Sequence, residues 1–344
     1  MSHSWLVASK IGTYLSIENN LVKLTVDCVS TGQLFAKPAT SVLAYLLSKA
    51  TIREEAMPLE ALVCAQSGLA PMPDYSIAAI TAAEDGVSVG ADYWLRADPV
   101  HLVLQRDSFS LSEPCPLSVS RAHAQAMIAS FNAHFAQEDG LKFCLGESGA
   151  WYVSLAQPPQ IKTALPAMAM GKNIAHFMPQ GSAASQWVAY LNEVQMLLHA
   201  HAANAEREGA GGVAVNSIWL SGGGVMPAPL AVKPDSDIDC MVGNTALYKG
   251  LAKHSGLMHH NISASLQSVI SQMAGHTHVR MQLAQDLLLA EDSFQALLNG
   301  LKKRSITQLV VNLACYEKTL VATIKPLDLY KFWRSTKPMS AYLV

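Results

Sequence analysis

Three consecutive glycines, Gly222, Gly223 and Gly224, follow a short apolar segment, residues 215–220, that is predicted to be a strand. Glycines at such a position allow a tight turn and direct successive backbone N–H groups toward one point. That arrangement suits a phosphate or a carboxylate. The run matches neither G-x-G-x-x-G nor G-x-x-x-x-G-K-[ST], so dinucleotide and P-loop sites are not predicted. The glycines therefore indicate either an anion site or a tight turn without a ligand.

His201, Asn204 and Arg207 recur at a spacing of three residues. On a helix this spacing brings the side chains close together on one surface. The guanidinium group of Arg207 suits bidentate binding of a phosphate or carboxylate. The alternative is a histidine at the edge of the core beside two solvated polar groups.

Asp235, Asp237 and Asp239 alternate along the chain. On a strand they would share one face, where carboxylates bind Mg²⁺. With Ser221-Gly222 upstream, the pattern resembles nucleotidyltransferases, in which a Gly-Ser turn precedes an Asp-x-Asp strand. Here the dipeptide is reversed, and prolines in the intervening segment oppose the helix found there in that family. The alternative is a solvated acidic turn.

Two histidine pairs, His259-His260 and His276-x-His278, could gather around a metal ion. No H-E-x-x-H motif is present, and no carboxylate or cysteine stands at a familiar ligand spacing from them. The leading prediction is therefore that the protein has no metal or other cofactor. Under the enzyme alternative the cofactor would be Mn²⁺ or Mg²⁺, and the candidate ligands are Asp235, Asp237, Asp239, His259 and His260.

The composition excludes several classes of protein. The 344 residues are 50 % hydrophobic and 15 % charged, with 24 Lys and Arg against 26 Asp and Glu. This balance argues against disorder and gives no basic field for nucleic acid. Prolines and glycines interrupt the longest uncharged stretches, so no membrane span is predicted. Six scattered cysteines without a C-x-x-C pair indicate reduced thiols and a cytoplasmic protein.

The hydrophobic pattern predicts both helices and strands, and hence a mixed α/β fold. Residues 1–85 are predicted to be helical segments with loops, and Pro99 is predicted to separate two strands. A Gly-rich segment between two apolar runs predicts a hairpin over residues 141–155. We expect an N-terminal α/β lobe over 1–160 that contains this hairpin, and a C-terminal lobe over 161–344. The other predicted elements are helices over 120–135, 182–207, 263–273 and 293–301, and strands over 306–313 and 319–324.

Residues 201–207, Gly211 and residues 216–227 resemble a block of the archaeal-type cofactor-independent phosphoglycerate mutases. In that family the block contains His-Pro-x-Asn-x-x-Arg, Pro-Ala-Asn and Gly-x-Gly-x-x-Pro. Residues 247–258 resemble the segment that follows. Most of the chain also resembles a related family, the RpfE-type bacterial regulatory proteins. The segments that carry this resemblance are 97–102, 191–199, 216–224 and 332–334. These resemblances imply a degenerate alkaline-phosphatase or phosphoglycerate-mutase-like fold, with a C-terminal mutase-like lobe that holds the long helix and the Gly-rich loop.

The differences from the mutases concern their catalytic groups. Those enzymes use two divalent metals, held by Asp and His, and a Ser nucleophile. Their metal sites include an early Asp-Gly-x-x-Asp motif, whereas the first 60 residues here contain one aspartate, Asp27, without a neighbouring glycine. No Asp-x-x-Gly-His cluster follows Gly256, and Ser221 replaces the arginine of the family's loop. The resemblance therefore predicts a retained scaffold that lacks the catalytic metals.

The leading hypothesis is a non-catalytic regulatory or interaction protein, whose partner is an unknown protein or a small anionic, phosphorylated metabolite. The alternative is a metal-dependent, mutase-like phosphoryl-transfer enzyme, and a third reading is a nucleotidyltransferase that uses Asp237 and Asp239. Neither nucleic acid nor a membrane is predicted as a partner. The predicted ligand-binding residues are His201, Asn204, Arg207, Asn216, Gly222, Gly223 and Gly224.

Overall fold

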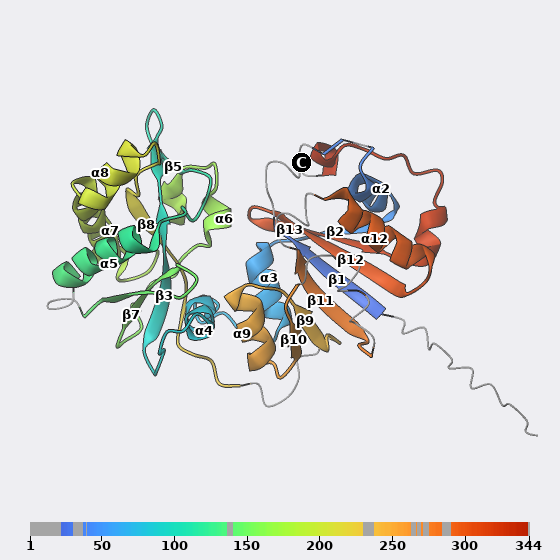
Figure 1. The fold of residues 1–344 in the computed structure, drawn as a ribbon, viewed down its shortest axis with the longest axis horizontal. Helices are drawn as coiled ribbons and strands as arrows, with labels where there is room; N and C mark the ends of the chain where they lie inside the picture. The colour runs from blue at the N-terminus through green and yellow to red at the C-terminus, as the bar shows by residue number, and fades with distance from the viewer. Residues whose placement is uncertain are drawn as a thin grey trace, which may run out of the picture.

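The protein forms two α/β lobes, each built on its own β-sheet (Figure 1). A computed structural model describes residues 22–29, 37–38, 40–135, 140–229, 237–262, 266, 270, 275–283 and 290–342. The predicted mixed α/β class is confirmed. Within these residues, none of the helices has the length and apolar character that crossing a bilayer requires.

The larger sheet has seven strands. The first five strands in spatial order run parallel to one another. The sixth pairs antiparallel with the fifth, and the seventh pairs antiparallel with the sixth. In spatial order the strands are β10 (Met258–His260), β9 (Cys240–Val242), β11 (His278–Leu283), β1 (Val22–Cys28), β12 (Ile306–Cys315), β13 (Lys318–Ile324) and β2 (Thr51–Glu55).

Helices cover both faces of the larger sheet, so its central strands are buried on both sides. On one face, α2 (Val42–Lys49) and α12 (Glu291–Lys302) pack on the alternate apolar residues of β1 and β12. On the other face lie α3 (Leu59–Gln66) and α9 (Ala246–His254). Two short 3₁₀ helices, η2 (Pro326–Tyr330) and η3 (Met339–Tyr342), follow β13.

The smaller sheet is antiparallel, in the order β6 (Lys142–Leu145), β7 (Trp151–Leu155), β3 (Tyr93–Val100) and β8 (Ser217–Gly224). One face packs on α5 (Arg121–Phe135) and α7 (Ala184–His199), and the other packs on α4 (Ile77–Glu84). Helix α4 also packs on α9, so it lies between the lobes (Figure 1). The remaining elements are the hairpin β4 (Leu102–Leu104) and β5 (Phe109–Leu111), α6 (Pro166–Ala169), η1 (Ile174–Phe177) and α8 (Ala202–Gly209).

Several predicted elements are present. The hairpin over 141–155 is β6–β7, and the predicted strands over 306–324 are β12 and β13, joined by a tight turn. The prediction of one continuous helix over 182–207 is wrong, because α7 ends at His199 and a second helix, α8, begins at Ala202. The break occurs where His201 caps α8: its side chain accepts a hydrogen bond from the N–H of Ala203.

Two further expectations are wrong. Residues 1–85 contain the strands β1 and β2, not only helices. Both faces of β1 are buried, which removes the alternation of polar and apolar residues that marks a half-exposed strand. Pro99 does not separate strands but lies inside β3, opposite Ile218. The helix predicted over 263–273 lies outside the described residues except at Leu266 and Ile270, which are helical.

The two sheets do not follow the predicted division at residue 160. The larger sheet combines β1 and β2 with β9–β13, and the smaller combines β3, β6 and β7 with β8. The reason is that β1 pairs in parallel with β11 and β12, far along the chain, and parallel pairs require long crossovers. The intervening chain folds as the smaller lobe.

Candidate binding site between the lobes

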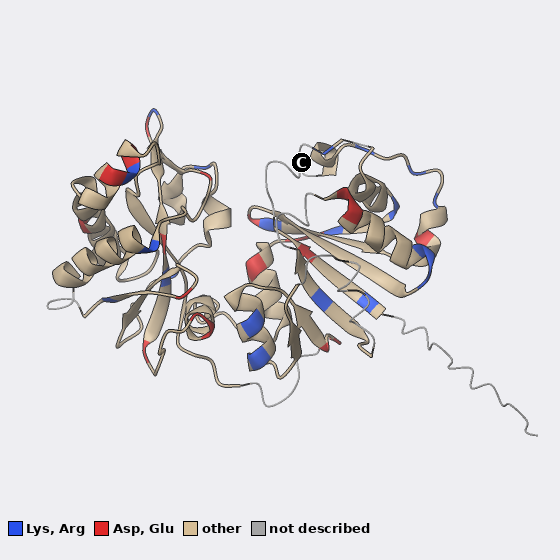
Figure 2. Cartoon of the chain, viewed as in Figure 1, with Lys and Arg blue, Asp and Glu red and all other residues tan. Residues whose placement is uncertain are grey.

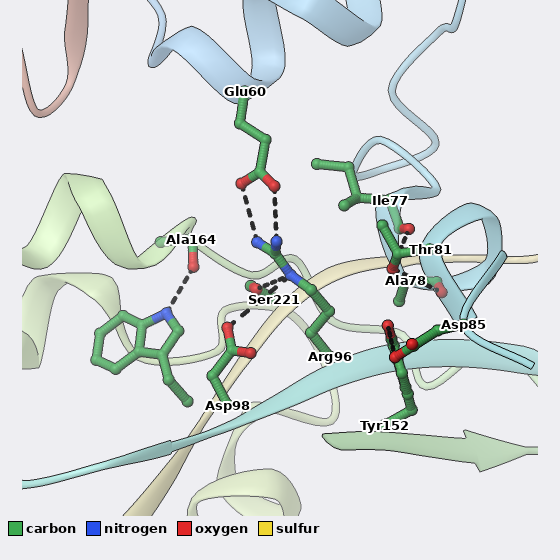
Figure 3. A network of polar contacts seen from close by, with 11 residues as sticks. Glu60, Ile77, Ala78, Thr81, Asp85, Arg96, Asp98, Tyr152, Ala164 and Ser221 are labelled. Carbon is green, nitrogen blue, oxygen red and sulfur yellow. Dashed lines mark hydrogen bonds and ion pairs between the residues drawn. The ribbon is translucent and has the colours of Figure 1, made fainter. Parts of the chain in front are cut away.

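A half-buried ion pair joins the two lobes. Arg96 on β3 donates from Nη1 and Nη2 to the two carboxylate oxygens of Glu60 on α3, at 2.6 and 3.0 Å (Figure 3). Its Nε donates to Ser221 Oγ on β8 at 3.1 Å. Bidentate charged hydrogen bonds of this kind are both strong and directional. They therefore fix the smaller sheet relative to α3.

A second carboxylate lies beside this pair. Asp98 follows Arg96 by two residues on β3, with Oδ2 3.9 Å from Arg96 Nε (Figure 3). Burial raises the pKa of Asp98 to about 6, although the positive charge of Arg96 opposes the rise. Asp98 is thus a carboxyl group whose charge is poorly compensated at neutral pH.

We expect Asp98→Asn to gain stability relative to the unsubstituted protein as the pH rises from 4 to 7, by about 2–3 kcal/mol. With a raised pKa, folded Asp98 holds its proton more tightly than the unfolded chain does. The favourable contribution of protonated Asp98 to the free energy of unfolding is therefore complete below about pH 4 and is lost as the pH rises through about 6. Urea unfolding at several pH values measures this. The control is Asp107→Asn at an exposed aspartate, and a pH-independent difference between Asp98→Asn and the parent would contradict the prediction.

A cavity of about 510 Å³ lies between the lobes, next to this network. Its walls are mostly apolar, with a few polar groups, as is typical of small-molecule sites. The larger lobe contributes Ala56, Met57, Pro58, Ala61 and Glu317; the linking segment contributes Pro71, Pro73, Asp74, Tyr75 and Ile77; the smaller lobe contributes Lys162–Leu165, Met168, His176–Met178, Gln180 and Gly222.

The polar groups of the cavity connect its walls. Asp74 accepts from the N–H and the hydroxyl of Thr163, at 2.9 and 2.5 Å, and burial raises the pKa of this carboxyl. Glu317 pairs with Lys172 at 2.9 Å, a second link between the lobes. The side chains of Lys162 and His176 are exposed at the cavity, and the positive charge of Lys162 lies near Asp74.

The predicted ligand-binding residues of α8 are hydrogen-bonded to backbone. Asn204 is buried; its Nδ2 donates to the carbonyls of Leu198 and Val215, and its Oδ1 accepts from the N–H of Val215. The guanidinium of Arg207 donates to the carbonyls of Val213 and Ser118. These side chains join the break between α7 and α8 to the start of β8.

His201 and Asn216 are also engaged. His201 Nε2 lies 3.0 Å from Ser130 Oγ on α5. The side chain of Asn216 pairs with both backbone groups of Leu102, at 2.7 and 2.9 Å. None of the four polar side chains lines the cavity, whereas Gly222 does. Their role in binding an anion stays a prediction.

The turn expected at the three glycines is instead the end of β8. A Cβ on Gly223 would lie 2.3 Å from Tyr93 Oη, and one on Gly224 would lie 2.1 Å from Ser76 Oγ. Gly222 has a φ of +65°, which favours glycine, where the register with β3 shifts. Gly222 and Gly224 thus allow Ile77 and Ser76, at the start of α4, to approach the sheet closely, and Gly223 makes room for the Tyr93 side chain of β3.

Gly224→Ala is expected to lower the free energy of unfolding by about 1–3 kcal/mol, as overpacking does. The new methyl group would also meet Ser76 Cα at 2.8 Å, so backbone must move. Gly209→Ala is the matched control, because nothing lies within 4 Å of its Cβ position and alanine favours a helix. Chemical unfolding of both variants measures the difference; equal stabilities would contradict this packing role.

The predicted metal ligands are largely engaged elsewhere. Asp237 pairs with Lys23 at 2.9 Å and with His278 Nδ1 at 2.8 Å, and His259 Nε2 lies 2.8 Å from the carbonyl of Gly243. Asp239 Oδ2 accepts from the N–H and hydroxyl of Thr277. Asp235 lies outside the described residues. Because Asp237 and Asp239 adjoin the larger sheet while Gly222 belongs to the smaller one, they do not form the nucleotidyltransferase arrangement.

The structure also contains a buried polar cluster that the sequence analysis missed. Asp27 at the end of β1 accepts from Arg280 Nε and Nη2 at 2.6 and 3.0 Å, from Asn312 Nδ2 at 2.7 Å, and from the hydroxyl of Tyr248. The side chains of Asp27 and Arg280 are both fully buried. Burial and the charge of Asp27 raise the pKa of Tyr248, so it donates as a neutral phenol.

Charged residues are otherwise scattered over both lobes, as Figure 2 shows. In the larger sheet, positive and negative residues occupy neighbouring strands, and Arg280 on β11 and Asp27 on β1 form one such pair. Buried charges are held in two ways: Arg280 and Asp27 form an ion pair, whereas Lys49, Asp74 and Asp85 are hydrogen-bonded to neutral groups.

Comparison with known proteins finds a distant relation in fold. No protein-family model and no curated protein matches the sequence. The structure is similar to cofactor-independent phosphoglycerate mutase from Thermoplasma acidophilum DSM 1728, with a TM-score of 0.40, 15 % identity, and coverage of 88 % of this chain and 89 % of that one. It is also similar to the PH0037 protein from Pyrococcus horikoshii, with a TM-score of 0.46, 11 % identity, and coverage of 88 % and 87 %. At these values the similarity concerns the fold and not an activity.

Proposed function

We propose that this chain is a non-catalytic, mutase-like binding protein of the RpfE type, with a regulatory or interaction role. The observation that carries the proposal is the state of Asp27. A metal-dependent phosphoryl-transfer site needs carboxylates that are open to a metal ion and a substrate. Asp27, the single aspartate in the first 60 residues, where the mutases carry an early metal-binding motif, is fully buried and accepts from Arg280, Asn312 and Tyr248.

The guanidinium group of Arg280 supplies the positive charge next to this carboxylate. A divalent cation would have to displace a fully buried arginine that is itself held by Gln66 Oε1 at 2.6 Å. Leaving that arginine unpaired in the core costs several kcal/mol. The polar cluster therefore supports a structural role for Asp27.

For the ligand, we propose a small anionic metabolite in the cavity between the lobes. Lys162 and His176 supply positive or hydrogen-bonding groups at its edge, and the apolar wall accommodates a carbon skeleton. Two interlobe contacts, Glu60–Arg96 and Lys172–Glu317, flank this space. A ligand there would contact both lobes, which is a physical basis for regulation through their relative position.

Two measurements test the proposal. Purified protein is expected not to convert 3-phosphoglycerate to 2-phosphoglycerate with Mn²⁺ or Mg²⁺; conversion would instead support the metal-dependent enzyme alternative. Calorimetric titration with 3-phosphoglycerate and with inorganic phosphate tests the ligand. Binding should weaken in Lys162→Gln and not in Lys142→Gln, whose lysine lies on β6 away from the cavity. Equal effects in the two variants would refute the cavity as the site.

We also propose that the protein is cytoplasmic. All six cysteines are free, which suits a reducing compartment. The alternative to the metabolite is an unknown protein partner. The cavity between the lobes supports the metabolite.

A further inference from the structure

One cysteine and two histidines converge at one edge of the larger sheet, away from the interlobe cavity. Cys240 is the first residue of β9, His260 is the last of β10, and His276 lies two residues before β11. These three strands are neighbours in the sheet. The cysteine sulfur and one ring nitrogen of each histidine all lie within 4.8 Å of one another.

This separation is close to that of ligands around one metal ion. Zinc binds cysteine sulfur at about 2.3 Å and histidine nitrogen at about 2.0–2.1 Å. Tetrahedral angles then place the ligand atoms about 3.3–3.6 Å apart. The observed separations, up to 4.8 Å, exceed that spacing by about 1 Å. The rings of His260 and His276 already lie edge to face, with centroids 5.9 Å apart.

The set of donor atoms selects the kind of metal. A thiolate with two imidazoles suits Zn²⁺ and similar borderline ions, whereas Mg²⁺, Ca²⁺ and Mn²⁺ prefer oxygen ligands. The chemistry therefore differs from that of the Mn²⁺ or Mg²⁺ considered for phosphoryl transfer.

A carboxylate lies beside one of the histidines. Asp239 Oδ1 lies 3.2 Å from His276 Nδ1, at ion-pair distance but without hydrogen-bond geometry. Within the described residues this buried oxygen has no hydrogen-bond partner, whereas Oδ2 is held by Thr277. A carboxylate on Nδ1 leaves Nε2 for a metal, the usual arrangement around metal-bound histidines. This buried oxygen, which has an ion-pair contact with His276 but no hydrogen bond, is a second observation at the same place.

We propose that Cys240, His260 and His276 bind one zinc ion, with Asp239 as the residue that positions His276 and with solvent as the fourth ligand. The ion fastens the three-residue edge strand β10 to β9 and β11. Within the described residues β10 pairs with β9 alone, and an edge strand of this kind is stabilised when a further contact holds it to the sheet. The role is structural, and the proposal goes beyond the proposed function because none of these residues lines the interlobe cavity.

Cobalt titration of the metal-free full chain tests the site. One equivalent of Co²⁺ is expected to bind and to produce a thiolate-to-cobalt charge-transfer band, which Zn²⁺ then removes. Cys240→Ser should abolish the band, and His276→Gln should weaken Co²⁺ affinity at least tenfold. The controls are Cys315→Ser, at another buried cysteine of the sheet, and His199→Gln at the end of α7. Both should bind as the parent does.

Folding of each variant is checked by circular dichroism. If Cys240→Ser does not fold, Asp239→Asn and His260→Gln give the decision, since both must weaken Co²⁺ binding. Zinc should also raise the melting temperature of the parent and not that of His276→Gln. Binding at no defined stoichiometry, or a band that persists in Cys240→Ser, would overturn the proposal. Neither result bears on metabolite binding, which is measured separately with Lys162→Gln.

Discussion

Arg280→Met is expected to lower the free energy of unfolding by about 3–5 kcal/mol, the cost of removing one partner from a buried ion pair. The substitution keeps the volume of the side chain but leaves the Asp27 carboxylate without its two charged hydrogen bonds. Asn312 and Tyr248 would remain as its donors, and these neutral groups do not balance a full charge in the core. Urea unfolding measures the loss.

The double variant Asp27→Asn with Arg280→Met provides the informative comparison. It removes both charges, so a large part of the lost stability should return. Arg106→Met is the control, because Arg106 is almost fully exposed and its pair with Asp107 contributes little. A loss below about 1 kcal/mol in Arg280→Met would show that water reaches the cluster and that the core is not closed around it.

Asn204→Ala is expected to lower the free energy of unfolding by about 3 kcal/mol. Its amide is the partner of the Leu198 carbonyl and of both backbone groups of Val215, and each buried group left unpaired costs about 1–3 kcal/mol. The expected consequence is a looser join between α7, α8 and β8. Asn192→Ala, at an exposed position of α7, is the control and should lie within about 0.5 kcal/mol of the parent.

This prediction also separates two roles for Asn204. If the residue binds an anion, a saturating phosphorylated ligand should stabilise the parent and not the variant. If its role is structural, the loss of stability is the same with and without ligand. Chemical unfolding in the presence and absence of 3-phosphoglycerate distinguishes the two.

The elements that the sequence predicts well are those whose signal is local. The helix α5, the hairpin β6–β7 and the hairpin β12–β13 each carry their periodicity and turn residues within one short segment. The strand β1 could not be recognised in this way, because helices cover both of its faces and its side chains are buried on each.

The site was less predictable because its contacts are distant in sequence. Glu60 and Arg96 are 36 residues apart, and Asp27 and Arg280 are 253 apart, so no spacing rule connects them. The residues at 201, 204 and 207 have the types and spacing of an anion site. Nothing local reveals that Asn204 is engaged by the Leu198 carbonyl, freed at the break between α7 and α8, or that Arg207 is engaged by the carbonyls of Val213 and Ser118.

The order of strands in the larger sheet has a consequence for synthesis on the ribosome. Both neighbours of β1 belong to the last third of the chain, and Asp27 is made 253 residues before Arg280. At about 5–20 residues per second this interval is on the order of 10–50 s. The smaller lobe is complete at Gly224 and can fold during that time, whereas β1 emerges as an apolar segment without strands to pair with. In the nascent chain β1 therefore stays without its partner strands until β11 and β12 have been released from the ribosome.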